Sequence, residues 1–330
     1  MKPQSPQTYV SGVLEGNRRM LAKTITLIES ALPEHRALAR TILDQLLPYT
    51  GKSIRLGITG VPGVGKSTFI ESLGMMLVEK GHQVAVLAVD PSSTRSGGSV
   101  MADKTRMEKL SVHPSAYIRP SPSGGTLGGV ARTTRETMLV CEAAGFDVLI
   151  VETMGVGQSE IKVASMVDFF LVLMLAGAGD ELQGIKKGVL EMADALAINK
   201  ADGQNIQNAQ KAREAYETAL SLLRPSSASW KPPVLICSAL EMSGIEDIWN
   251  TVLEHRKRLA ATGEFKEKRR RQALEWMWSI VEEGLKERFY QHPDIKRILK
   301  KVTKEVEKGM TAPPDAAYAL LSLLDDRSCG

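Results

Sequence analysis

The sequence is poor in cysteine, and its positive and negative charges nearly balance. Its 330 residues include only three cysteines, Cys141, Cys237 and Cys329, which are widely separated and odd in number. A disulfide framework is therefore not expected. The chain has 42 lysines and arginines against 38 aspartates and glutamates. This small basic excess does not favour nucleic acid or a membrane surface as a partner.

Clustered histidines and long apolar runs are also missing. The five histidines form no pair at metal-ligand spacing, which argues against a histidine-based metal site. The most apolar run, 169–178, has about half the length needed to cross a bilayer. The first eight residues are polar and include two prolines, unlike a secretory signal. We therefore expect a soluble, cytoplasmic protein.

A glycine-rich loop with a characteristic spacing is present. Residues 60–67 read Gly-Val-Pro-Gly-Val-Gly-Lys-Ser and match the pattern G-x-x-x-x-G-K-[ST]. An apolar run, 54–59, precedes the loop and predicts a strand, and 67–80 predicts a helix. This order directs main-chain N–H groups and the positive end of the helix at a phosphate chain. We expect the Lys66 amine to contact the β- and γ-phosphates and the Ser67 hydroxyl to bind Mg²⁺. The residues predicted to hold the nucleotide phosphates are Gly60, Val61, Pro62, Gly63, Val64, Gly65, Lys66, Ser67 and Thr68.

Between residue 53 and about residue 256, short apolar runs alternate with helical patterns. The predicted strands are 54–59, 84–89, 147–151, 169–174, 195–199 and 234–238. The predicted helices are 67–80, about 128–144, 181–193, 205–223 and 245–262. Strands rich in Val, Ile and Leu without polar alternation are typical of a sheet that is covered on both faces. The pattern predicts the α/β class, a P-loop NTPase with a doubly wound, mostly parallel sheet flanked by helices.

Helical segments flank this α/β region. Residues 11–47 predict two amphipathic helices: one carries Leu14, Leu21, Ile25 and Ile28 on a single stripe, and the other starts near Pro33. After Gly263 the predicted elements are the helices 265–290, 294–308 and 314–324. We therefore divide the chain into an N-terminal helical extension (1–50), a nucleotide-binding domain (51–262) and a C-terminal helical arm (263–330).

Three further stretches predict surfaces or loops. The basic run 266–271 is interpreted as a solvated helix face or, failing that, as a surface for an acidic protein. The helix with Trp276 and Trp278 is apolar on more than one face, so it should be buried on the parent domain or against a second copy. The glycine- and serine-rich stretches 91–100 and 120–129 predict nucleotide-sensing loops rather than linkers.

The sequence Asn199-Lys200-Ala201-Asp202 follows a predicted strand and favours guanine over adenine. The Asp202 carboxylate can accept hydrogen bonds from guanine N1–H and from its exocyclic amine, while the Lys200 stem covers the ring. Adenine has a lone pair at N1 and no amine at C2, so an unpaired carboxylate would cost about 1–3 kcal/mol. Ser238, Ala239 and Leu240 end the next predicted strand, where main-chain N–H groups can meet the base carbonyl. The combination predicts GTP as the ligand.

Acidic residues end two predicted strands beside the glycine-rich loop. Asp90 and Glu152 are placed to hold Mg²⁺ or its waters, although such carboxylates can also cap a turn. Glu152-Thr-Met-Gly155 occupies the place of the D-x-x-G element of small GTPases, so the Gly155 N–H would meet the γ-phosphate. No glutamine directly follows Gly155, and Gln158 comes three residues later. We therefore expect slow intrinsic hydrolysis that a partner accelerates.

Four longer motifs make the chain resemble the MeaB/ArgK family of methylmalonyl-CoA mutase-associated GTPases, grouped with the metallochaperone-type P-loop GTPases. These motifs are 90–107, 119–129, 151–160 and 179–188. The resemblance implies a homodimeric GTPase that dimerises through its C-terminal arm. It also implies a chaperone of adenosylcobalamin-dependent methylmalonyl-CoA mutase, which gates cofactor loading and protects or reactivates that enzyme.

The same resemblance assigns roles that the residue pattern alone does not. It implies that Asp90 and Asp103 join Ser67 and Glu152 around Mg²⁺. It also implies that 90–107, 153–160 and 177–188 are switches, with Lys186 as a charge stabiliser in the last of them. By residue type alone, Lys186 would be interpreted as part of a solvated helix face.

Two alternative functions are kept. Older naming in the family refers to a kinase linked to amino-acid transport, but no H-R-D or D-F-G element is visible in the sequence. A metallochaperone would carry paired cysteines or a histidine-rich tail, and neither is present.

Overall fold

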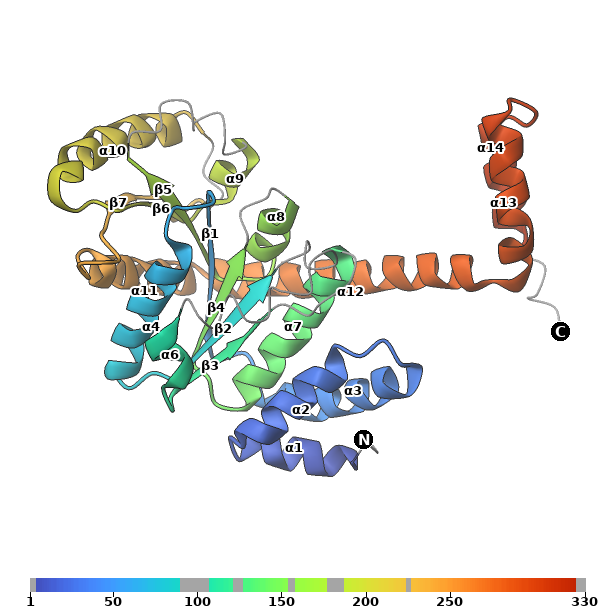
Figure 1. The fold of residues 1–330 in the computed structure, drawn as a ribbon, viewed down its shortest axis with the longest axis horizontal. Helices are drawn as coiled ribbons and strands as arrows, with labels where there is room; N and C mark the ends of the chain where they lie inside the picture. The colour runs from blue at the N-terminus through green and yellow to red at the C-terminus, as the bar shows by residue number, and fades with distance from the viewer. Residues whose placement is uncertain are drawn as a thin grey trace. The chain divides into compact units, whose positions relative to one another are not determined.

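The computed structural model describes residues 4–89, 107–120, 127–153, 158–176, 187–223 and 227–324. The chain forms two compact units, 1–272 and 273–330, which are taken in turn (Figure 1). The first unit holds the sheet and the N-terminal helices, and the second holds most of the C-terminal helices.

A seven-stranded parallel sheet forms the centre of the first unit in the described residues. Its strands lie in the order β3-β2-β4-β1-β5-β6-β7, and every neighbouring pair is parallel. Their bounds are β1 Ile54–Gly60, β2 Val84–Val89, β3 Ala116–Arg119, β4 Val148–Thr153, β5 Phe169–Leu175, β6 Ala195–Asn199 and β7 Val234–Ile236. The predicted doubly wound α/β class is confirmed. Strands β2 to β4 lie on one side of β1, and strands β5 to β7 lie on the other. In folds of this type, ligands bind at the carboxyl ends of the strands where the strand order reverses in this way.

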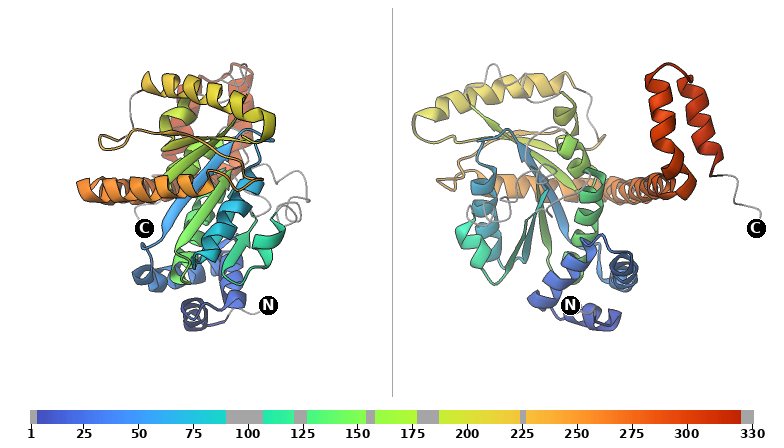
Figure 2. Two further views of the ribbon diagram at one scale, coloured as in Figure 1. Left: turned by 90° about the vertical axis from the view of Figure 1, so that its left-hand side faces the viewer. Right: turned by 45° about the vertical axis from the view of Figure 1, so that its right-hand side comes forward.

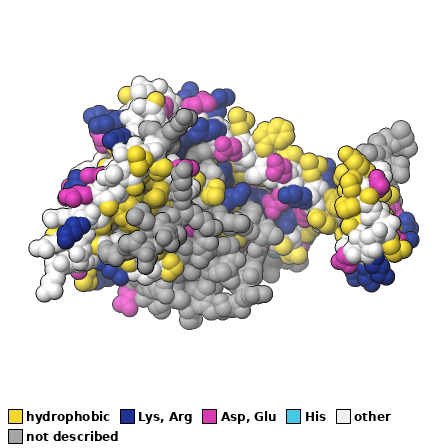
Figure 3. Space-filling model, turned by 90° about the horizontal axis from the view of Figure 1, so that it is seen from above, with side chains coloured by type: hydrophobic (Ala, Val, Ile, Leu, Met, Phe, Trp, Pro, Cys, Tyr) yellow, Lys and Arg dark blue, Asp and Glu magenta, His cyan; other side chains and the backbone are white. Residues whose placement is uncertain are grey.

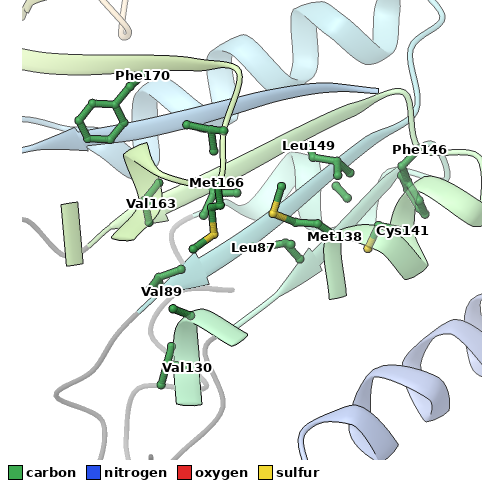
Figure 4. Packing of buried hydrophobic residues seen from close by; sticks show 14 of the residues in the cluster. Leu87, Val89, Val130, Met138, Cys141, Phe146, Leu149, Val163, Met166 and Phe170 are labelled. Atoms are coloured by element: carbon green, nitrogen blue, oxygen red, sulfur yellow. The ribbon is translucent and has the colours of Figure 1, made fainter. Parts of the chain in front are cut away.

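Helices cover both faces of the sheet. On one face lie α4 Lys66–Glu79, α6 Glu108–Val112 and α11 Ile245–Thr262. The other face is covered by α7 Leu127–Ala143, α8 Gln158–Ala164, α9 Lys187–Met192, α10 Ile206–Ser221 and the N-terminal helices. Alternate strand residues point to opposite faces: Leu149 and Val151 pack on the α7 side, while Val148 and Ile150 pack on the α4 side. Figure 4 shows part of the α7 side, where Leu87, Val89 and Leu149 of the strands lie near Val130, Met138 and Cys141 of α7, while Phe170 lies near Val163 of α8.

Among the described strands and α-helices of the sheet domain, three short ones were not predicted: β3, α6 and α8. The β3 run is Ala-Tyr-Ile-Arg, four residues long and partly polar, so it carries too little apolar pattern to stand out. The other two are a five-residue and a seven-residue helix, shorter than the windows in which helical periodicity shows. The predicted helix 181–193 is described only from residue 187 on.

The N-terminal extension contains three helices, and the prediction of two was wrong. They are α1 Pro6–Leu14, α2 Arg18–Ile28 and α3 Pro33–Leu46, followed by the short η1 Leu47–Tyr49. Gly16 has a φ of 69°, and the Asn17 side chain accepts hydrogen bonds from the N–H groups of Arg19 and Met20 at 3.1 Å each. This cap starts a new helix and leaves Leu14 outside the expected stripe. Pro33 begins α3 as predicted. All three helices pack against α7 (Figure 2).

Part of the basic run is partly buried at the amino ends of the strands. It lies in the first turns of α12, Glu264–Gln291. The Arg269 guanidinium forms two hydrogen bonds with the Asp168 carboxylate, at 2.8 and 2.7 Å. The Lys268 amine donates to the Asp168 carbonyl at 2.7 Å and to the Asp194 carboxylate at 3.2 Å. The predicted solvated face is therefore wrong for Lys268 and Arg269, because both side chains neutralise buried carboxylates of their own chain.

The second unit is helical throughout its described residues. After α12 come α13 Pro293–Glu307 and α14 Pro313–Ser322, which contact each other and begin at the prolines that predicted their starts. Its buried side chains include Ile295 and Ala316. Its large exposed apolar side chains include Leu274, Met277, Trp278, Ile280, Val281, Leu285, Tyr290, Met310, Tyr318, Leu321 and Leu324.

Among the described residues, no helix joins sufficient length to the apolar character that spanning a membrane requires. Lysine, arginine and acidic side chains are interspersed over the described surface visible in Figure 3. This mixing agrees with the nearly balanced composition of the chain.

Candidate functional site

The glycine-rich loop joins the carboxyl end of β1 to the start of α4. Gly60 has a φ of 153°, and a β-carbon built there would lie 2.5 Å from the Leu173 carbonyl oxygen of β5. Gly65 has a φ of 92° and immediately precedes the first residue of α4. At both positions the backbone conformation favours glycine, and at Gly60 the close approach of β5 excludes any side chain. The loop therefore turns tightly and presents its main-chain N–H groups at the start of a helix.

The Lys66 amine lies along the inside of this loop. It donates hydrogen bonds to the carbonyls of Gly60 at 2.8 Å and Val61 at 3.2 Å. Val64 is fully buried, whereas Pro62 and Gly63 at the tip are exposed, as is Thr68 on the first turn of α4. An ammonium that rests on neutral carbonyls can move to a phosphate, which attracts it more strongly. The loop thus has a cation within reach of a phosphate chain bound at its rim.

A hydroxyl and a carboxylate meet beside the loop. The Ser67 hydroxyl donates to the Glu152 carboxylate at 3.4 Å, and Glu152 lies at the end of β4 with 6% of its surface exposed. The neighbouring Thr153 hydroxyl donates to the Thr59 hydroxyl of β1 at 2.6 Å, which fixes the end of β4 against β1. Hydroxyl and carboxylate oxygens are ligands that Mg²⁺ prefers. This pair fits a magnesium site that bound phosphates would complete.

Several predicted site residues lie outside the described residues: Asp90, Asp103, Gly155 and Lys186. The described strand β2 ends at Val89, directly before Asp90, and β4 ends two residues before Gly155. Within the described ranges, no three His, Cys, Asp or Glu side chains form a group that could hold a metal ion.

Asn199 connects the glycine-rich loop to the two segments predicted to bind the base. Its side-chain amide donates to the Val64 carbonyl at 2.9 Å, and its side-chain oxygen accepts from the Ala239 N–H at 3.1 Å. Asn199 is 1% exposed and ends β6. A buried amide with partners on both of its polar atoms holds three chain segments at fixed separations.

Lys200 and Asp202 follow Asn199 at the rim of the site. The Lys200 backbone has a φ of 60°, and its amine donates to the Gly63 carbonyl at 2.7 Å. One Asp202 carboxylate oxygen accepts from the Ser238 hydroxyl at 2.7 Å, and that hydroxyl in turn accepts from the Glu241 N–H at 3.2 Å. The carboxylate is thereby oriented while it stays partly exposed. It can still accept hydrogen bonds from a planar ligand that carries adjacent N–H groups.

Ser72 belongs to the site's framework, although no sequence pattern singled it out. From the second turn of α4, its hydroxyl donates to the Ala239 carbonyl at 2.7 Å. This hydrogen bond anchors the segment 238–240 to α4. Leu240 at the end of that segment is 80% exposed. A serine on a helix carries no sequence signal of such a contact, which depends on where the fold places the segment 238–240 relative to α4.

The nearby thiol takes no part in this chemistry. Cys237 is buried directly before Ser238, and burial raises its pKa to about 12. A thiol with that pKa stays protonated near neutral pH and is a poor nucleophile there.

Comparison with known proteins connects this geometry to a family. The model of the methylmalonyl-CoA mutase-associated GTPase MeaB family matches residues 21–294. The GTPase Rv1496 of Mycobacterium tuberculosis is 52% identical over 96% of this chain and 95% of its own length. The mitochondrial methylmalonic aciduria type A homolog of Mus musculus is 46% identical over 96% of this chain and 79% of its own. The solved structure of a LAO/AO transport system kinase superposes with a TM-score of 0.79 at 40% identity, covering 98% of this chain and 99% of that one.

Proposed function

The chain belongs to the MeaB family of methylmalonyl-CoA mutase-associated GTPases, and we propose that it acts as a GTP-hydrolysing chaperone of that mutase. It is a GTPase that binds guanine nucleotide. In the proposed role, its nucleotide state gates the loading of adenosylcobalamin into the mutase and protects or reactivates the enzyme. The family name and the mouse relative support the link to the mutase.

One observation carries the proposal for the ligand. Asn199 joins the glycine-rich loop to the segment 238–240, and Ser238 orients the Asp202 carboxylate at the same rim. A phosphate-binding loop and an acceptor for adjacent N–H groups are therefore held in one rigid arrangement. Guanine presents N1–H and the exocyclic amine to such an acceptor, and adenine does not.

For catalysis, we propose that Lys66 stabilises the phosphate charge and that Ser67 and Glu152 hold Mg²⁺. The ion would neutralise charge on the β- and γ-phosphates. Asp90 and Asp103 as further magnesium ligands, Gly155 as a γ-phosphate donor and Lys186 as a charge stabiliser remain part of the proposal. Intrinsic hydrolysis is expected to be slow and raised by the mutase, because no glutamine directly follows Gly155.

We also propose a homodimer formed through the C-terminal arm. The second unit exposes a series of large apolar side chains, among them Trp278, Leu285 and Tyr290. A monomer rarely leaves so many apolar side chains in water, whereas an interface with a second copy would bury them. A cytoplasmic location completes the proposal; the two described cysteines, Cys141 and Cys237, are free and buried, which fits a reducing compartment.

Two alternatives are kept, and the experiment below distinguishes the first of them from the chaperone. The similar solved structure is named a LAO/AO transport system kinase, and that name keeps a kinase linked to amino-acid transport as an alternative. A metallochaperone is less well supported, because the described residues offer no cluster of metal ligands.

The experiment measures phosphate release from labelled GTP by the full chain with Mg²⁺, with and without purified methylmalonyl-CoA mutase. Stimulation by the mutase supports the chaperone. Label transferred to an amino acid or to a protein, in place of free phosphate, would support the kinase. Unchanged hydrolysis with mutase over its whole concentration range would contradict the proposed partnership.

A further inference from the structure

Helix α2 of the N-terminal extension is bound to the edge strand β3 at both of its ends. At the start of α2, the Arg18 guanidinium donates to the carbonyls of Pro114 at 2.8 Å and Ala116 at 2.6 Å. At the other end, the Glu29 carboxylate accepts two hydrogen bonds from Arg119, one of them at 3.0 Å from Nε. The first contact lies at the amino end of β3 and the second at its carboxyl end.

The contact at the carboxyl end is a paired, partly buried charge interaction. The Glu29 and Arg119 side chains are 13% and 25% exposed, and the Thr26 hydroxyl accepts a further hydrogen bond from Arg119 at 3.4 Å. The pair lines a small hollow together with Leu87 and Ala88 of β2 and with threonines of α7. Glu29 therefore reaches the strand ends on the side of the sheet where the nucleotide site lies.

The strand register relates Arg119 to Glu152, the carboxylate proposed to hold Mg²⁺. Arg119 lies opposite Leu87 of β2, and Leu87 lies opposite Val151 of β4. The next residue of β4 is Glu152, which accepts the hydrogen bond of Ser67. In the described residues β3 pairs with β2 alone, so its carboxyl end has one strand neighbour, and the Arg119 side chain adds the contact with Glu29 of α2.

We propose that Glu29 is a positioning residue for GTP hydrolysis: paired with Arg119, it fixes the carboxyl ends of β3 and β2 and thereby the alignment of Glu152 with Ser67. The inference rests on the proposed nucleotide site. Through Glu29, the N-terminal extension would affect the rate of GTP hydrolysis in addition to covering one face of the sheet. Arg18 also joins α2 to this strand, through hydrogen bonds to main-chain carbonyls at its far end, and supplies the control.

The test compares Glu29→Gln with Arg18→Ala in the full chain. Both variants lose contacts between α2 and β3, so both should lower the melting temperature. Only Glu29→Gln should lower kcat for GTP hydrolysis, by about fivefold, with GDP affinity within about twofold of the parent. GDP binding is spared because the phosphate and base loops follow β1, β6 and β7, which Glu29 does not touch.

A double variant tests whether the pair acts as a unit. Adding Arg119→Gln to Glu29→Gln should lower kcat no further than the single change does, because the interaction is already lost. If Glu29→Gln fails to fold, Arg119→Lys keeps the charge, loses the two-fold hydrogen bonding and should show the same loss of kcat.

Amide hydrogen exchange gives a readout that does not depend on turnover. Glu29→Gln should speed exchange at the carboxyl ends of β2 and β4, and Arg18→Ala should not. Equal effects of the two variants on exchange and kcat, or no effect of Glu29→Gln on either, would overturn the inference. If the parent protein binds no guanine nucleotide, the proposed function itself fails, and the exchange experiment still decides whether Glu29 fixes these strand ends.

Discussion

The two edges of the sheet use the same kinds of charged residue in opposite ways. At the carboxyl edge, Lys66 and Lys200 donate to neutral carbonyls of the glycine-rich loop. At the amino edge, Lys268 and Arg269 donate to the buried carboxylates of Asp194 and Asp168. The amines at the carboxyl edge line a loop whose main-chain N–H groups suit a phosphate, whereas the cations at the amino edge neutralise buried carboxylates of their own chain. The comparison shows that the partner of a basic residue, rather than its presence in a basic run, indicates a binding site.

Substitution at the amino edge should lower the stability of the fold. Arg269→Ala removes both hydrogen bonds of this side chain to the Asp168 carboxylate. The Asp168 side chain, which is 4% exposed, then lacks its charged partner. Breaking a buried pair from one side costs about 3–5 kcal/mol of unfolding free energy. Chemical denaturation should show this loss, while the affinity of the folded fraction for GTP stays unchanged. The exposed neighbour Arg270, which pairs with Glu267, supplies the control: Arg270→Ala should leave the denaturation midpoint close to that of the parent. Equal losses from the two variants would contradict the distinction.

Substitution at the carboxyl edge should weaken nucleotide binding and leave the stability of the fold unchanged. Lys66→Ala removes a charged phosphate contact and no core side chain, so calorimetry should show GTP affinity weakened by at least roughly 10- to 150-fold. The melting temperature without nucleotide and the oligomeric state should match those of the parent. Loss of folding in this variant would show that the lysine has a structural role like that of Arg269.

A smaller change at the same edge should alter the choice of base. In Asp202→Asn the amide places a donor group where guanine also presents donors. The GTP preference over ATP should fall by about tenfold or more, in competition binding with both nucleotides. Ser238→Ala, which removes only the support of that carboxylate, should have a weaker effect in the same direction. Unchanged discrimination in Asp202→Asn would refute the role of this residue.

The smallest effect is a pH dependence confined to the amino edge. Burial would raise the pKa of Glu142, but the hydrogen bond and charge of Arg55, together with Ser53 and Gly51, outweigh it and lower this pKa. The unfolded chain therefore binds a proton at higher pH than the folded chain does. The stability that this pair contributes is present above the ordinary glutamate pKa, near about 4.3, and is lost as pH falls through the folded value.

Denaturation midpoints measured from neutral pH down to about pH 3 should show this acid loss. Glu142→Gln should reduce its slope, since the glutamine does not titrate. The Asp194 carboxylate, whose pKa is lowered against its burial chiefly by Lys268 and also by His255, should keep part of the slope in that variant. An identical pH profile for the parent and Glu142→Gln would contradict the assignment.

The elements with a long or special local pattern were predictable from the sequence. Strands such as β2 and β6 were placed with their observed bounds, and α4 and α11 were placed to within a residue. Pro33, Pro293 and Pro313 begin helices as expected. The break between α1 and α2 was missed because it depends on Gly16 and the Asn17 cap, which interrupt a stripe that looks continuous. The strand β3 was missed because its four residues carry little apolar pattern, while its partners β2, Arg18 and Glu29 lie far away in the chain.

By itself, the sequence determined the α/β alternation, the position of the glycine-rich loop and the order in which the base-binding segments follow it. These features depend on local periodicity and on residues whose backbone requirements are local. Only the tertiary structure decided that Asn199 joins three segments, that Ser72 supports one of them, and that Lys268 and Arg269 are internal partners rather than surface. Those contacts join residues far apart in the chain, and a side chain of a given type has no local property that reveals which distant group it meets.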